Sequence, residues 1–440
     1  MAESGDGLKR ELGLRDLTFF AVACIVGTRW IAAAAHAGPG AITLWLLAAI
    51  LFMVPLAIAV AALVVKYPGT GGLYLWTRND FGKWHGFLCF VVYWFGMAIW
   101  FPSAAIFYMS AGLSALGPRY AHLAQNRPVV LAVSLVAIWI ALGTNLVGLK
   151  VGKWTQTIGA AATWLLGALL VAAAFAIGSR HGVATPMQIF PKWDWETVSF
   201  WSAIAYAMSG LELAGLMGGE IHDPERTLPR AGWIASGVST LFYVSATVAM
   251  LVILRPGQIS EMNGLTEVGR AAAESLHFPL LMPAIAILVL LSAVGQFGGI
   301  GTSVSRLPFV VGVDRLLPAG FGKVHPRWGT PHIAIFTLGL LASFLLVAIQ
   351  LGDTMRAAYQ ELVSLMVITG FLPFLYIFGS AWKAGKRWSA VSGWAITLLA
   401  ILCSVVPTAE VTNVWLFEGK LILGTAAVIG LAGWLYRRTK

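Results

Sequence analysis

The chain has 440 residues, of which 58% are hydrophobic and only 11% are charged. Soluble proteins carry about 25% charged residues, so this composition excludes an ordinary water-soluble fold. The formal net charge of +10 does not indicate a nucleic-acid partner, because the Lys and Arg residues stand singly or in pairs between apolar runs. The composition predicts an all-α integral membrane protein whose solvent is the lipid bilayer.

Apolar runs of about 20 residues, the length that crosses a bilayer as a helix, recur twelve times. A Gly-Pro-Gly turn at residues 38–40 separates the first run from the second. We therefore expect a single transporter-sized membrane domain, residues 1–440, with twelve transmembrane helices. The runs begin near Leu17, Ile42, Phe87, Val129, Thr157, Val198, Trp233, Leu280, Ile333, Tyr359, Val391 and Leu421.

The first run is interrupted near its centre by Val26, Gly27, Thr28 and Arg29. An arginine at that depth costs about 2.5–3.5 kcal/mol on insertion scales, so it requires a partner or a water-filled cavity. Two interpretations follow. Arg29 lines a binding site, or it forms an ion pair that holds helices together.

The sixth run contains a second interruption. Tyr206 and Ala207 precede Ser209 and Gly210, and Glu212 follows. A carboxylate at this depth can pair with Arg29, hold a substrate ammonium or take up a proton, and the residues alone leave all three open.

The two interrupted runs stand five helices apart. Interruptions at corresponding positions are typical of transporters built from an inverted repeat. We expect repeat one at about residues 16–180, repeat two at about 196–382, and two peripheral helices at about 388–437.

The distribution of basic residues predicts the orientation. With the amino terminus in the cytoplasm, 20 of the 29 Lys and Arg residues lie inside, 8 lie outside, and Arg29 lies within the membrane. This asymmetry follows the positive-inside rule. It predicts a multi-pass protein of the cell membrane, plasma or inner, with both termini cytoplasmic.

The sequence offers no set of residues for a metal, a cofactor or covalent catalysis. Cys24, Cys89 and Cys403 lie singly in apolar runs, without a CxxC spacing. The zinc-protease, nucleophile and phosphate-loop motifs are absent. We expect no cofactor, no metal and no enzymatic activity.

Four ordered stretches resemble the amino acid–polyamine–organocation superfamily, and within it the L-amino-acid-transporter-like permeases. They cover nearly the whole chain, and together they are specific, although each alone is weak. They are residues 27–31 (GTRWI); 67–74 (YPGTGGLY) with 80–82 (DFG); 210–212 (GLE) with 220–231 (EIHDPERTLPRA); and 303–307 (SVSRL) with 314–318, 325–326 and 330–331.

The resemblance implies the LeuT-type fold, two inverted five-helix repeats plus two peripheral helices. It also implies secondary transport of amino acids by alternating access. The substrate carboxylate would meet the first break at Gly27, Thr28 and Arg29. Residues of the second break, Tyr206, Ala207 and Ser209, would line the ammonium and side-chain end, with Tyr206 as an aromatic gate.

Two departures from the family pattern concern charge. Arg29 replaces a glycine, and the helix-five lysine of many proton-coupled or sodium-independent members is absent from residues 160–164, which include Thr163. Three partners for the Arg29 charge are open. They are Glu212, a carboxylate of the substrate, and an oxygen-rich region containing Ser292 and Gln296, where Arg29 would replace the missing lysine. We favour the last, which predicts sodium-independent transport with protons as the candidate coupling ion.

The leading hypothesis is a secondary active transporter of amino acids, a symporter or an exchanger. One alternative is a carrier of organic anions whose carboxylates bind Arg29, because arginine suits bidentate carboxylate recognition. An alternative of another class is a non-transporting membrane sensor on the same scaffold.

Overall fold

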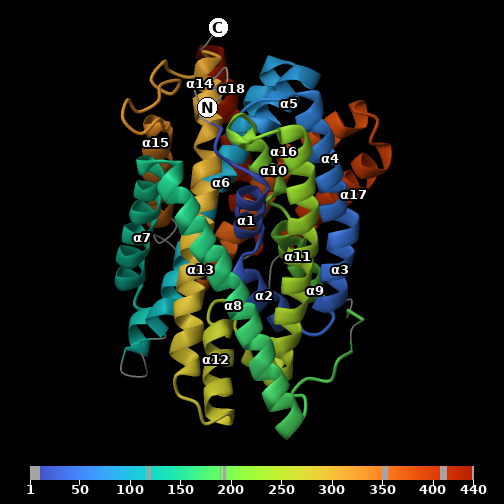
Figure 1. Ribbon diagram of the computed structural model, residues 1–440, viewed down its shortest axis with the longest axis vertical. Helices are drawn as coiled ribbons and strands as arrows, with labels where there is room; N and C mark the ends of the chain where they lie inside the picture. The colour runs from blue at the N-terminus through green and yellow to red at the C-terminus, as the bar shows by residue number, and fades with distance from the viewer. Residues whose placement is uncertain are drawn as a thin grey trace.

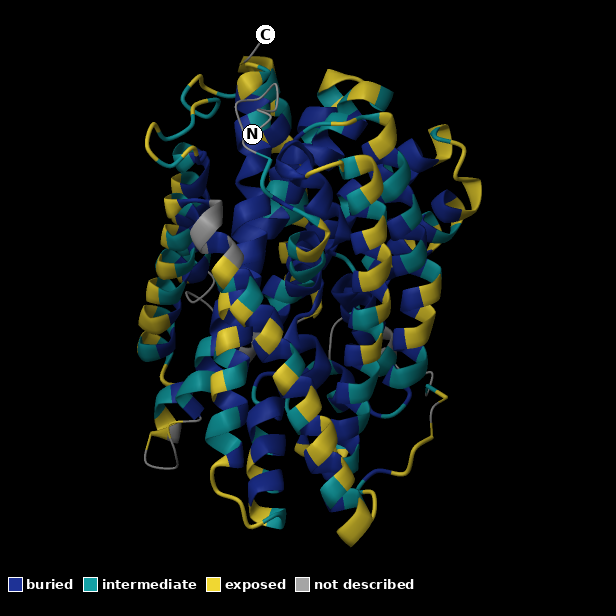
Figure 2. Ribbon diagram, viewed as in Figure 1, coloured by how far each residue is buried: buried dark blue, intermediate teal, exposed yellow. Residues whose placement is uncertain are grey.

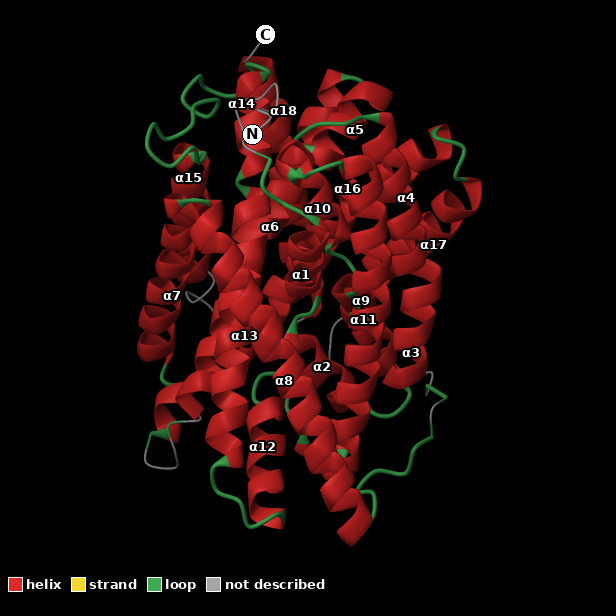
Figure 3. Ribbon diagram, viewed as in Figure 1, coloured by secondary structure: helices red, strands yellow, loops and turns green. Residues whose placement is uncertain are grey.

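The computed structural model describes residues 10–114, 116, 120–188, 190–191, 195–348, 355–406 and 414–438. Over these residues the chain forms helices and loops and no strand, apart from one isolated bridge between Leu12 and Ile221 (Figure 3). The long helices run side by side in a bundle, with α5 and α14 at one end and α12 at the other (Figure 1).

The helices of the described residues follow the order of the predicted runs, but fewer than twelve of them meet the length and hydropathy of a membrane span. Nine helices are long and apolar enough to cross a bilayer, and α1 with α2 forms a tenth, bent span. α15 is apolar but has only 17 residues, and α9 with α10 occupies the place of the sixth run. The helices are α1 (Leu14–Ile25), α2 (Thr28–Ala37), α3 (Ala41–Ala48), α4 (Val54–Lys66), α5 (Gly72–Phe81), α6 (Lys83–Ser114), α7 (Arg127–Val147), α8 (Leu149–His181), α9 (Trp195–Ala207), α10 (Leu211–Leu216), α11 (Pro224–Ile253), α12 (Gly264–Ser275), α13 (Leu281–Val304), α14 (Arg306–Val313), α15 (His332–Ala348), α16 (Met355–Lys383), α17 (Arg387–Ser404) and α18 (Val414–Arg438).

Several helices begin well before the apolar run that predicted them. α11 begins at Pro224 rather than near Trp233, and α18 at Val414 rather than near Leu421. A proline in the first helical turn costs no hydrogen bond, so α11 can start in the polar segment. Hydropathy marks the part of a helix inside the hydrocarbon, and the helix itself continues into the headgroup region.

Burial follows the pattern expected in lipid. The helices at the centre of the bundle are buried, and exposed residues lie on the outer faces and at the ends (Figure 2). The side chains of Phe175, Leu402 and Leu423 on outer faces are 79%, 68% and 70% exposed. Such exposure would be costly in water, but lipid chains are as apolar as these side chains.

The second span contains a π-helical turn, Ala49–Met53, between α3 and α4. Pro55 follows it and has no backbone N–H, so the Leu51 carbonyl loses its helical donor. The Ser392 hydroxyl on α17 donates to that carbonyl at 2.6 Å. α17 therefore replaces a hydrogen bond that the bilayer cannot supply.

Candidate functional site

Two helical interruptions lie close to the residues at which breaks were expected. α1 ends at Ile25 and α2 begins at Thr28, with a bend of 43° between them. Thr28 and Arg29 thus belong to the first turn of α2, and Val26 and Gly27 alone are extended. The second interruption separates α9, which ends at Ala207, from α10, which begins at Leu211.

The two interruptions lie against each other, because Gly210 closely approaches the end of α1. Gly210 has φ +120°, a conformation that favours glycine. A Cβ atom on Gly210 would lie 3.2 Å from the Ile25 Cα atom and 3.3 Å from the Cys24 carbonyl carbon. Glycine at this position allows the two backbones to meet where both helices leave polar groups without helical partners.

The hydroxyl of Tyr243, on α11, joins both interruptions. It accepts from the Gly27 N–H at 2.9 Å and donates to the Ile25 carbonyl at 2.7 Å, and the Ala207 carbonyl lies at 3.3 Å. The Tyr243 ring stacks on Trp45 with centroids 4.2 Å apart. Nothing in the local sequence distinguishes Tyr243 from the other tyrosines of the apolar runs.

The Arg29 guanidinium is buried, with the residue 1% exposed, and it points toward α6 and α16. Its Nη1 atom donates to the Ser103 hydroxyl at 2.7 Å, and its Nη2 atom lies 3.6 Å from the Met366 sulfur. The guanidinium carbon lies 4.2 Å from the centre of the Trp30 ring and 5.5 Å from that of Trp100. Aromatic faces and the hydroxyls of Ser103 and Tyr359 therefore surround the cation.

Arg29 has no anionic partner in the described part of the chain. Each of the ion pairs found there involves other residues, and the buried Nε atom of Arg29 has no hydrogen-bond partner. Each of the two cation–π contacts contributes about 0.5–2 kcal/mol, which offsets part of the cost of placing the charge at this depth. The site therefore holds a fixed positive charge with no carboxylate at ion-pair distance among the described residues.

Glu212 does not form the ion pair with Arg29 that the sequence offered as one possibility. Its carboxylate accepts from the Gly210 N–H at 2.9 Å and from the Tyr93 hydroxyl at 2.8 Å, and the residue is 1% exposed. Two helices thus hold this carboxylate at the start of α10, where a helix N-terminus favours negative charge.

Tyr206 lies between the two interrupted helices and α16. Its ring makes edge contacts with Trp30 and Phe371, at centroid distances of 6.2 and 5.3 Å. A Cβ on Gly370 would lie 2.6 Å from the ring, so glycine makes room for it. The Ser209 hydroxyl donates to the Tyr206 carbonyl at 2.7 Å, which places it in the local backbone turn.

The region around α13 does not contact the Arg29 guanidinium by hydrogen bonds. The Gln296 carbonyl oxygen accepts from Tyr108, whose oxygen accepts from Thr28, while Ser292 donates within its own helix. Thr163 likewise donates to the Gly159 carbonyl. The favoured interpretation, with Arg29 compensated near Ser292 and Gln296, differs from this geometry, because the side chain leaves α2 on the face toward α6.

α8 and α13 pack with backbone against backbone. A Cβ on Gly159 would collide with the Gly295 Cα atom, and a Cβ on Gly295 would lie 2.7 Å from the Gly159 Cα atom. Small residues allow this close packing of membrane helices. The helix pair leaves no space for a long side chain at this level.

Residues 67–82, 220–231 and 303–318, which belong to the stretches that carried the family resemblance, meet at the α5 end of the bundle. Arg306 makes a two-point ion pair with Glu220, at 2.9 and 3.1 Å, and both side chains are 2% exposed. The Glu220 carbonyl also accepts from the N–H groups of Glu11 and Leu12. The sequence alone does not predict this pair, since 86 residues separate Glu220 from Arg306.

A second charged group lies at the same end. Asp314 pairs with Arg78 and accepts from Tyr74. Asp80 accepts from Lys66 at 3.0 Å and from Tyr67 at 2.6 Å. Burial alone would raise the pKa of Asp80, but the hydrogen bonds from Tyr67 and Lys66 hold it below its usual value.

Comparisons with known proteins agree with this arrangement. The family described as "Amino acid permease" matches residues 12–419. An uncharacterized transporter of Legionella pneumophila is 24% identical over 98% of this chain and 97% of its own length. The serine/threonine exchanger SteT of Bacillus subtilis is 25% identical over the same shares. The lysine-specific permease LysP of Escherichia coli is 25% identical over 84% of this chain and 77% of its own length.

Proposed function

Because this chain belongs to the amino acid permease family of the amino acid–polyamine–organocation superfamily, we propose that it is a secondary active transporter that moves amino acids by alternating access. The chain is a multi-pass membrane protein with the LeuT-type fold of that family. Within it, we assign repeat one to about residues 16–180 and repeat two to about 196–382.

The observation that carries the proposal is the meeting of two interrupted helices beside buried charges. The first N–H groups of α2 and the last carbonyls of α1 and α9 lack partners within their own helices. A helix N-terminus favours a carboxylate and a helix C-terminus favours a cation, so the two breaks suit the two ends of a zwitterion. The proposed binding residues are Val26, Gly27, Thr28, Arg29, Tyr206, Ala207, Ser209, Gly210 and Glu212.

The decisive experiment is uptake by the purified full-length protein in proteoliposomes. We expect vesicles preloaded with an amino acid that the protein transports to take up the same amino acid, labelled, from outside. A carrier of organic anions, which the uncompensated Arg29 favours as a second candidate, would instead exchange dicarboxylates that lack an amino group. A non-transporting sensor would be stabilised by its ligand without any flux, and either of these outcomes would overturn the proposal.

Glu212→Gln is expected to abolish the pH dependence of uptake, whatever its effect on the rate of exchange at a fixed pH. The substitution keeps the size of the side chain and an oxygen for the Gly210 N–H, but it removes the group that can carry a proton. The measurement is uptake at a series of pH values and under an imposed pH gradient. Glu361→Gln is the control, because that carboxylate pairs with the partly exposed Lys420. An unchanged pH profile in Glu212→Gln would show that Glu212 is not the coupling group.

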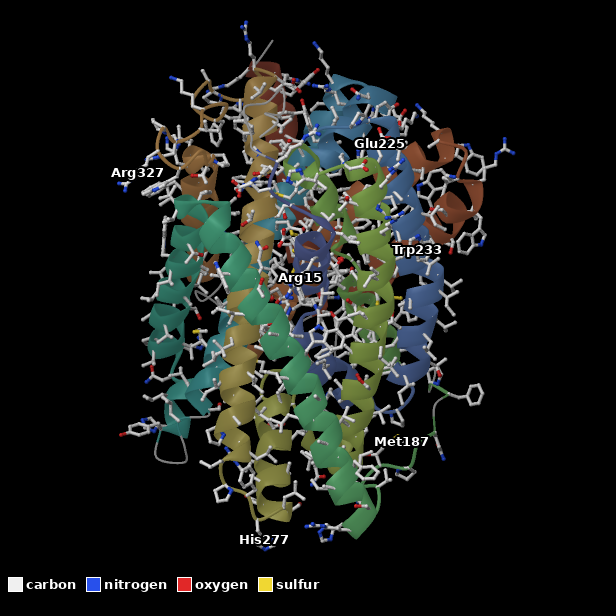
Figure 4. All side chains as sticks on the ribbon, in the orientation of Figure 1. Arg15, Met187, Glu225, Trp233, His277 and Arg327 are labelled. Carbon is white, nitrogen blue, oxygen red and sulfur yellow. The ribbon has the colours of Figure 1, made fainter. Side chains whose placement is uncertain are left out.

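Both termini are expected to face the cytoplasm. The basic residues favour that side, and the structure brings the two ends of the described chain to one end of the bundle. Leu12 pairs with Ile221 beyond α10, and Tyr436 on α18 packs on Trp84 at the start of α6. In Figure 4, Arg327 and Glu225 lie toward this end, and His277 and Met187 toward the other.

Reporter fusions to either terminus that were active only outside the cell would contradict the assignment. Lys440 itself lies outside the described residues.

A further inference from the structure

We propose that the substrates are amino acids with an acidic side chain, and that the second carboxylate binds the Arg29 guanidinium. This inference rests on the proposed function and deepens it by naming the substrate class. It starts from a buried cation whose Nε–H has no hydrogen-bond partner and which forms no ion pair in the described part of the chain.

The Arg29 guanidinium has more N–H donors than the acceptors around it use. Guanidinium has five N–H donors in a planar fork that matches a carboxylate. Ser103 accepts one of them, the Tyr359 hydroxyl interacts with the group, and the Met366 sulfur at 3.6 Å is a weak acceptor. The Nε–H has no partner. A carboxylate bound across Nε and one terminal nitrogen would satisfy the open edge.

Ser103 adds a second donor at the same place. Its oxygen accepts from Arg29 at 2.7 Å, so its own proton remains available to a second acceptor. The Trp30 and Trp100 rings pack around the guanidinium and exclude water. A carboxylate between Arg29 and Ser103 would therefore receive charge-assisted hydrogen bonds in an apolar surrounding, where they are strongest.

The position of the guanidinium separates it from the groups that suit the amino acid backbone. Those groups lie at the breaks, where Tyr243 touches Gly27, Ile25 and Ala207. The Arg29 side chain extends away from them toward α6 and α16. A substrate whose α-carboxylate and ammonium lie at the breaks would reach Arg29 with its side chain.

Charge balance selects an acidic side chain. Arg29 cannot lose its proton, and Glu212 already accepts from Gly210 and Tyr93 rather than from Arg29. A neutral zwitterion would leave the buried cation uncompensated, and a basic amino acid would add a second cation. An acidic amino acid carries a net charge of −1 and neutralises Arg29.

The test is calorimetric binding to the full-length protein in nanodiscs, with glutamate and aspartate compared with glutamine and asparagine. These pairs differ only in the side-chain carboxylate. We expect the acidic member of at least one pair to bind at least about 10-fold more tightly than its amide, as for charge-assisted hydrogen bonds. Amides that bind as tightly as both acids would overturn the inference, and so would glutarate binding as tightly as glutamate.

Three variants connect the preference to the residues. Arg29→Gln should remove the preference for the acid, Arg29→Lys should retain part of it because the charge remains without the fork, and Ser103→Ala should weaken acid binding several-fold. Unaltered acid preference in Arg29→Gln would overturn the inference. The elution profile and thermal stability without ligand establish that each variant is folded.

Transport data separate this inference from the proposed function. If neutral amino acids move and neither glutamate nor aspartate does, the acidic-substrate inference fails and the transporter assignment stands. If none of the twenty amino acids moves, the transporter assignment fails as well.

Discussion

Replacing Arg306 with alanine is expected to lower the free energy of unfolding by about 3–5 kcal/mol, because it leaves the Glu220 carboxylate buried without its counter-charge. Both side chains are 2% exposed and their contact has two points. Arg306 also donates to the Thr302 carbonyl at 2.8 Å. The substitution therefore leaves a buried carboxylate without its counter-charge and removes one of the two side-chain donors to the Thr302 carbonyl, the other being the Ser305 hydroxyl.

The measurement is thermal unfolding followed with a thiol-reactive dye. Cys24, Cys89 and Cys403 are buried, so the dye reacts only as the protein opens. Asp223→Asn is the matched control. Its pair with Arg226 spans 3.9 Å, with side chains 58% and 79% exposed, and exposed pairs contribute at most about 1 kcal/mol.

A double variant distinguishes a stranded charge from lost packing. Glu220→Leu combined with Arg306→Met removes both charges and fills similar volume, and such replacements are often neutral or stabilising. We expect this variant to be more stable than Arg306→Ala and to transport poorly, because the pair joins the exit of α10 to α14. A double variant as unstable as the single one would show that packing dominates.

The bundle was predictable because hydropathy and charge act through the bilayer itself. Every long apolar run must be a helix in lipid, so the spans follow from composition alone. The short α12 escaped prediction because it is not an apolar run, and its residues are covered by α2 and α13 rather than by lipid. A hydropathy profile does not detect such helices.

The site was predictable in its position and not in its contacts. Gly27 and Gly210 beside buried charges marked the breaks, since intramembrane charge requires an explanation. The direction of the Arg29 side chain was not predictable, because Ser103 and Met366 lie 74 and 337 residues away. Glu212 similarly finds Tyr93 across 119 residues. Which of several nearby polar groups pairs with a charge is decided by tertiary packing, which no spacing in the sequence encodes.

Tyr243→Phe is expected to reduce uptake at least about 10-fold and to lower the free energy of unfolding by about 1–2 kcal/mol. The hydroxyl accepts from the Gly27 N–H and donates to the Ile25 carbonyl. A water molecule could not take its place in this buried site without distorting the breaks. The Trp45 ring stacked on Tyr243 should hold phenylalanine in the same place, so the variant tests the oxygen atom alone.

The kinetics of this variant distinguish a positioning role from a merely stabilising one. If the hydroxyl holds the backbone of both breaks in the geometry that binds substrate, KM should rise, and it should do so at temperatures well below unfolding. Tyr376→Phe is the control. The Tyr376 hydroxyl hydrogen-bonds to the exposed side chain of His85, so its loss should change the free energy of unfolding by less than about 0.5 kcal/mol. Uptake by Tyr243→Phe with an unchanged KM would mean that the two breaks keep their geometry through the close contact of Gly210 with α1 alone, without a hydroxyl between them.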